Sequence, residues 1–141
     1  EPLENNVRLI MHKTSTFPNV KVFQGGLGAH LAIDTYPESL DLKNRQAGIH
    51  LQIGKIPNYR TQQKESVRRS FPVFAIDDLM SQTHLSFGHF DVEGSEVELL
   101  HGARKTIERD RPIFTVESFP MTNKTRHLLL MKTIQKMEYK C

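Results

Sequence analysis

Phe87-Gly88-His89-Phe90-Asp91-Val92-Glu93-Gly94-Ser95-Glu96 joins an apolar run to the start of a helix, and this stretch decides the fold. The residues from Leu85 to Phe90 are typical of a strand. Ser95 with Glu98 three residues later forms a capping-box pattern, which predicts that a helix begins here. Apolar residues then recur at helical spacing and predict one buried face: Leu99, Leu100, Ala103 and Ile107.

A second strand and a second helix follow toward the C-terminus. Residues 112–116 form an apolar run that predicts a buried strand, which Glu117 closes. A last helix is expected from about Lys124 to Glu138, with one stripe made of His127, Leu130, Met131, Ile134 and Met137. The alternation of strand and helix predicts an α/β fold with right-handed βαβ units over a parallel sheet.

The N-terminal half carries weaker signals. The spacing of apolar residues predicts a helix over residues 3–14 and a strand over residues 20–23, which stops at the glycine cluster of residues 25–28. Residues 29–72 read as a loop-rich insertion with one or two small strands around residues 49–53. A strand is expected at residues 73–76, after which Asp77 or Asp78 caps a short helix.

Composition narrows the functional class. The chain has 141 residues with 38% hydrophobic and 25% charged residues, as expected for one globular domain. Its net charge of +3 is scattered, which argues against a nucleic-acid-binding protein. Cys141 is the only cysteine, so no intrachain disulfide can form, and no apolar run approaches the roughly 20 residues of a membrane span. Compartment and oligomeric state stay open.

Residues that end strands are the candidates for chemistry, because ligands of open α/β sheets bind at the carboxyl ends of the strands. Glu1, the glycine cluster, Asp91, Glu93 and Glu117 lie at such positions. A carboxylate there can accept hydrogen bonds from ribose hydroxyls, bind a cation or take a proton. A purely structural role remains the alternative for each of these residues, and for the glycines that role is a tight turn. Helix capping is the structural explanation for four further acids: Glu96, Glu98, Asp77 and Asp78.

Other kinds of site find little support. The seven histidines show no HExxH or other metal-ligand spacing, so no metal ligand is assigned among them. The terminal position of Cys141 argues against a Cys–His nucleophile, and no GxSxG elbow is present.

Residues 87–96, followed by Leu99-Leu100-His101-Gly102-Ala103, resemble the signature of the FkbM-type methyltransferases. That family shows an apolar strand, Lys-Ile-Asp-Val-Glu-Gly-Ala/Ser-Glu, and a helix with Leu-x-Gly-Ala. Further segments resemble the family in the same order: Glu1-Pro2, residues 22–28, Phe74-Ala75-Ile76-Asp77-Asp78-Leu79 and Arg111-Pro112-Ile113-Phe114-Thr115-Val116-Glu117.

The resemblance implies a Rossmann-like methyltransferase sheet with flanking helices, S-adenosylmethionine as methyl donor, and a small-molecule or sugar-like acceptor methylated on oxygen. By family analogy, Glu1 would bind the ribose hydroxyls, and Gly26, Leu27 and Gly28 would border the adenine. Asp91 would face the transfer site as a base or polar anchor, with Glu93 and Glu117 nearby.

The chain also departs from the family pattern. His89 stands where lysine is usual, Gly88 replaces a bulky apolar residue, and Ala29 replaces an acid common at the adenine. The first strand with its glycine-rich loop would precede Glu1, and the last strands would follow Cys141. We therefore expect residues 1–141 to be one partial domain, incomplete at both ends.

Two alternatives accompany the methyltransferase hypothesis. The first is a non-catalytic binding or interaction domain on the same scaffold, because fold alone does not fix function. The second is a metal-assisted methyltransferase in which Asp91 and Glu117 share a divalent cation through oxygen ligands.

Overall fold

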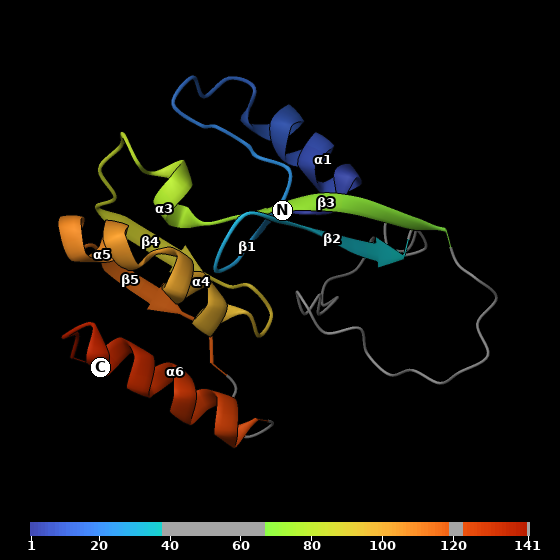
Figure 1. Cartoon of the computed structure of the whole chain (residues 1–141). Coiled ribbons are helices and arrows are strands. Elements are labelled where there is room, and N and C mark those ends of the chain that lie inside the picture. Colours follow the sequence, from blue (N-terminus) through green and yellow to red (C-terminus); the bar gives the residue numbers. More distant parts are fainter. Residues whose placement is uncertain (38–66, 119–122, 141) are drawn as a thin grey trace. The chain divides into compact units, whose positions relative to one another are not determined.

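The computed structural model describes residues 1–37, 67–118 and 123–140, which form two compact units (Figure 1). The first unit comprises residues 1–26 and 32–73, and the second comprises residues 27–31 and 74–141. Both contain helices and strands, so the α/β prediction is confirmed in this coarse form. The described strands form one three-stranded and one two-stranded sheet, and the complete Rossmann-like sheet stays a prediction.

The first unit contains helix α1 (Glu4–Thr14) and an antiparallel strand pair. Strand β2 (Ala32–Pro37) pairs with β3 (Arg68–Phe74), and the short β1 (Gly26–Leu27) completes the order β1-β3-β2. A small core forms where α1 begins, made of Leu3, Tyr36, Phe71 and Val73. The Tyr36 hydroxyl accepts a hydrogen bond from the Glu4 amide, which ties the start of α1 to the strand pair.

Several N-terminal predictions need correction. The helix over residues 3–14 is confirmed, but residues 20–23 form no strand, and Val20 and Phe23 are exposed. Their apolar character alone could not make a strand, because a strand also needs a paired neighbour. Residues 32–37, placed in the loop-rich segment, form β2, and the strand expected at 73–76 runs instead over 68–74. The strand suggested around residues 49–53 lies outside the described residues.

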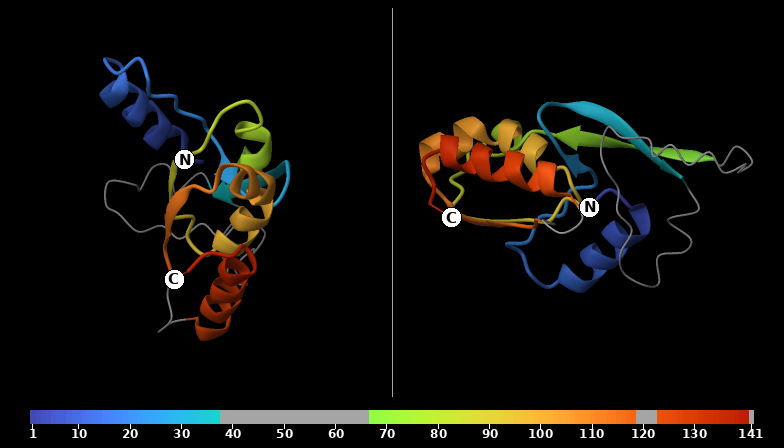
Figure 2. Two further views of the ribbon diagram at one scale, coloured as in Figure 1. Left: turned by 90° about the vertical axis from the view of Figure 1, so that its left-hand side faces the viewer. Right: turned by 90° about the horizontal axis from the view of Figure 1, so that it is seen from below.

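The second unit is built on the parallel pair of β4 (Phe87–Phe90) and β5 (Ile113–Val116). Between them run α4 (Glu96–Gly102) and α5 (Arg104–Asp110), and α6 (Lys124–Lys136) follows. Figure 2 shows these three helices on the same side of the strand pair. The strands and the helices between them make the βαβ unit that the sequence predicts, but the single helix expected from Ser95 ends at Gly102, and α5 begins separately at Arg104.

The predicted apolar face forms the core of this unit. Leu99, Leu100, Ala103 and Ile107 are fully buried, and Leu130 and Ile134 of α6 pack on them. Burial of a leucine or isoleucine side chain stabilises a fold by about 1.5–3 kcal/mol, so this face is the main source of stability here. The β5 prediction was wrong in one respect: its residues are exposed or half-buried, because the helices cover only one side of the pair.

Glycine at position 88 has a packing explanation. The Phe90 ring folds back over Gly88, so a Cβ there would lie 2.5 Å from a ring carbon. Phe90 is buried and also contacts Phe114. Gly88 therefore leaves room for an aromatic side chain that belongs to the core.

Carboxylates anchor both ends of α5. Asp77, from α3 (Ile76–Leu79), accepts hydrogen bonds from the amides of Lys105 and Thr106 at 3.1 and 2.8 Å. The short helix predicted here forms, but the prediction that Asp77 or Asp78 caps it was wrong: Ala75 is the N-cap residue, and Asp77 instead accepts amides at the start of α5. At the other end, hydrogen bonds from Arg109 and from the Leu85 amide hold the pKa of Asp110 well below its ordinary value.

Candidate active site

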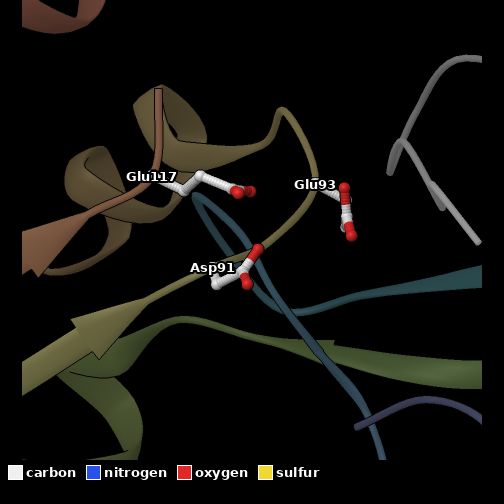
Figure 3. A group of neighbouring side chains, drawn as sticks. All are labelled: Asp91, Glu93 and Glu117. Carbon is white, nitrogen blue, oxygen red and sulfur yellow. The ribbon is translucent and has the colours of Figure 1, made fainter. Parts of the chain in front are cut away.

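Three carboxylates meet at one end of the β4–β5 pair (Figure 3). Asp91 follows β4 directly, Glu93 lies in the next turn, and Glu117 follows β5 directly. Each residue offers an oxygen atom, and these atoms lie within 4.8 Å of one another. The structure therefore brings together the three residues that the sequence placed nearest to the chemistry, and we call them the acidic trio.

The turn after Asp91 has an unusual backbone. Glu93 and Gly94 have φ angles of 52° and 95°, in the left-handed region that favours glycine. For Glu93 this conformation costs energy of the order of 1–3 kcal/mol, so surrounding contacts must hold it. The Gly94 amide donates to Glu96 Oε1 at 2.8 Å, and the Ser95 amide donates to the Val92 carbonyl at 3.2 Å.

The capping box predicted at Ser95 and Glu98 does not form. Ser95 is the N-cap residue of α4, but its side chain accepts no capping hydrogen bond. Glu98 instead pairs with Arg126 of α6. A local sequence pattern cannot predict an ion pair between residues so far apart in the chain.

A hydrogen bond with the Asp91 carboxyl raises the pKa of Glu117 above its ordinary value. Burial and the negative charges of Asp91, Glu93 and Glu96 act in the same direction. Glu117 therefore retains its proton more readily and can donate it to the Asp91 carboxylate, which keeps further oxygen lone pairs for a substrate hydroxyl. Such a pair can accept a proton or contribute to the binding of a cation.

Two polar contacts beside the trio escaped the sequence analysis. Arg126 Nε donates to the Gly94 carbonyl at 2.5 Å. The Ser118 hydroxyl lies 2.6 Å from His127 Nδ1. Ser118 could have been suspected from the sequence, because it follows Glu117 directly. Nothing in the sequence indicated that it contacts His127.

The residues proposed for the cofactor lie in both units. Glu1 and Gly26 belong to the first, whereas Leu27 and Gly28 belong to the second. Glu1 is exposed and uses Oε1 to accept the Leu3 amide at 2.9 Å, and its carbonyl accepts the Gly25 amide at 3.0 Å. A carboxylate suits the two hydroxyls of a ribose, so the chemistry of Glu1 fits S-adenosylmethionine.

The glycine turn fits the cofactor less directly. The Gly28 amide already donates to the Phe74 carbonyl at 2.9 Å, and Leu27 packs against the core of the second unit. Gly28 also lies against α4, where a Cβ on Gly102 would come within 2.1 Å of the Gly28 oxygen. Any contribution of this turn to adenine binding would therefore come from its surface and not from the Gly28 amide.

Three histidines of the second unit, His84, His89 and His101, are exposed. His84 Nδ1 lies 3.1 Å from the Ser86 hydroxyl, and His89 Nδ1 lies 2.7 Å from the Thr115 hydroxyl on the exposed side of the strand pair. His101 is exposed on α4. Among the described residues, the group whose geometry could hold a metal ion is the acidic trio.

The model of the FkbM methyltransferase domain matches residues 62–141. This segment is more than half of the chain and includes the βαβ unit, the acidic trio and α6, so the chain belongs to the FkbM methyltransferase domain family. The resemblance seen in the sequence is thus confirmed, and membership of this family indicates a methyltransferase-type domain. No curated protein and no solved structure matched the chain. Within the described ranges, the helices are too short or too polar to cross a membrane.

Proposed function

We propose that this protein transfers a methyl group from S-adenosylmethionine to a hydroxyl group of a small-molecule or sugar-like acceptor. The observation that carries the proposal is the acidic trio, whose carboxylate oxygens lie within 4.8 Å of one another at the ends of two parallel strands within the segment that matches the family. Ligands of such sheets bind at this end of the strands.

Asp91 and Glu1 have different roles in this proposal. When bound, S-adenosylmethionine supplies an electrophilic methyl group, and Glu1 holds its ribose hydroxyls. Asp91 orients the acceptor hydroxyl and takes its proton, while Glu117 keeps Asp91 in place by a hydrogen bond and Glu93 contributes negative charge.

The test uses the full-length protein with S-adenosylmethionine labelled on the methyl group and a panel of hydroxylated acceptors. Wild-type protein should transfer the label, and Asp91→Asn should transfer it much more slowly. Glu108→Gln is the matched control, because Glu108 is an exposed acid on α5 that pairs with Arg104. Binding of the cofactor without transfer to any hydroxyl would favour the non-catalytic binding domain instead.

The geometry of the acidic trio also bears on the metal-assisted alternative. Oxygen ligands of this kind suit Mg²⁺ or Ca²⁺. Transfer that stops when a chelator is added and returns with Mg²⁺ would support a bound cation. Transfer that persists in the chelator would leave proton transfer to Asp91 as the mechanism.

A further inference from the structure

Helix α6 begins beside the segments that carry the acidic trio. Arg126, in its first turn, is largely buried, with 20% of its side chain exposed. Its Nε donates to the Gly94 carbonyl, and its terminal nitrogen pairs with Glu98 on α4. One guanidinium thus fixes both the left-handed turn after Asp91 and the helix that follows it.

The next residue of α6 contacts the other strand end. His127 Nδ1 lies 2.6 Å from the hydroxyl of Ser118, the residue after Glu117. The Glu117 amide donates to the Phe90 carbonyl at 3.0 Å, so this strand end is also joined to β4. The two neighbouring residues of α6 therefore reach the two segments that bear the carboxylates.

The position of this turn is itself well defined. Asn123 caps α6 by accepting the Arg126 amide on its side chain at 3.1 Å, and its carbonyl accepts the His127 amide at 3.0 Å. One turn further on, Leu130 is buried in the core beneath α4. The first turn of α6 can therefore act as a rigid support.

We propose that Arg126 and His127 are positioning residues that hold the acidic trio in its working geometry. Glu117 can share a proton with Asp91, but Glu93 adds a like charge within 4.8 Å of both, and Glu93 lies in a disfavoured backbone conformation. Without outside contacts, both effects would move the Glu93 turn and the Glu117 strand end apart. The contacts from α6 oppose this movement from both sides.

Four variants of the full-length protein test the inference. Arg126→Met removes both contacts to the β4 side, and Arg126→Lys keeps a charge for Glu98 but lacks the forked guanidinium. His127→Phe and Ser118→Ala each break the same contact on the β5 side. Lys124→Met is the control, because Lys124 is exposed in the same turn of α6.

Amide hydrogen exchange reads the positioning directly and does not depend on the proposed reaction. Arg126→Met should speed exchange at Gly94 by about tenfold, and His127→Phe should do the same at Glu117, while the Leu130 amide keeps its protection. Equal exchange at Gly94 and Glu117 in wild type and variants would overturn the inference. Equal acceleration at every amide would also overturn it, because the residues would then serve general stability only.

The kinetic readout rests on the proposed function. We expect Arg126→Met and His127→Phe to lower kcat by about tenfold with little change in KM, and Arg126→Lys to recover part of the loss. The double variant Ser118→Ala/His127→Phe should lower kcat no further than His127→Phe alone, because both substitutions remove the same contact. If the wild-type protein transfers no methyl group, the proposed function fails and the exchange measurement alone decides the positioning role. Unchanged kcat in both variants of an active enzyme would refute it.

Discussion

Replacing Gly102 by alanine tests the close packing between α4 and the glycine turn. A Cβ at this position would lie 2.1 Å from the Gly28 oxygen and 3.1 Å from the Ala29 Cα. Both of these atoms belong to the backbone, so no side-chain rotation can make room. Either the end of α4 or the turn must move, and the hydrogen bond between the Gly28 amide and the Phe74 carbonyl opposes movement of the turn.

The size of the effect follows from two opposing terms. Forcing an extra carbon into a packed interior costs about 1–3 kcal/mol, and more where the backbone must shift. Alanine is favoured over glycine in a helix interior by about 1 kcal/mol, but Gly102 is the last residue of α4 and would gain less. We therefore expect Gly102→Ala to lower the free energy of unfolding by about 2 kcal/mol.

Urea unfolding monitored by circular dichroism measures this difference, with the slope against denaturant checked for constancy. His101→Ala is the control, because His101 is exposed on the same helix and should change the free energy of unfolding by less than about 0.5 kcal/mol. A Gly102→Ala protein as stable as the wild type, or more stable, would show that the turn does not lie against α4 as described.

The remaining predictions concern the carboxylates. Asp91→Asn keeps the shape of the side chain but cannot take a proton, so turnover should fall by about tenfold or more. Calorimetry should find little change in cofactor affinity. Unchanged turnover would show that Asp91 has only a structural role. Glu1→Ala should weaken S-adenosylmethionine binding by about 1.5–3 kcal/mol, and equal affinities by calorimetric titration would reject its ribose role. The raised pKa of Glu117 means that the folded state binds this proton more tightly than the unfolded state, so its contribution to stability is present at low pH and is lost as pH rises through the raised pKa. Glu117→Gln, which can still donate to Asp91, should therefore gain stability over the wild type as pH rises, and parallel stability curves from pH 4 to 8 would contradict the shift.

The parts of the fold that the sequence predicted are those with strong periodic burial. The apolar face of α4 and α5 and the buried stripe of α6 follow from helical spacing, because all three helices pack on the same core. The parallel pairing of β4 and β5 follows from the helices between them. Strand β2 was missed because its outer residues are exposed, as Ile33 shows with 79% of its surface accessible, so its pattern does not resemble a buried strand.

The sequence predicted the carboxylates of the candidate site but not the residues that hold them in position. Strand-end position alone singled out Asp91, Glu93 and Glu117, and the structure confirms that they lie together. Arg126 and His127 of α6 contact Gly94 and Ser118, which neighbour these carboxylates in the chain, and no local sequence pattern predicts such contacts between distant elements. The same limit explains Asp77, whose capping chemistry was recognisable although the helix that it caps begins far along the chain.

The alignment of β4 with β5 is also determined far from the acidic trio. At the start of the strands, Asp110 accepts the Leu85 amide at 2.8 Å, and the Ile113 amide donates to the Ser86 carbonyl at 3.1 Å. Six residue steps, at about 3.3 Å each, separate Leu85 from Asp91, and a slip by one residue would turn alternate side chains to the opposite face. The hydrogen bond between Asp110 and Leu85, roughly 20 Å along the strand from Asp91, thus acts together with the bond from the Glu117 amide to the Phe90 carbonyl to bring Asp91 beside Glu117. We expect a variant at Asp110 that lets the strands slide to separate Asp91 from Glu117 without altering either carboxylate.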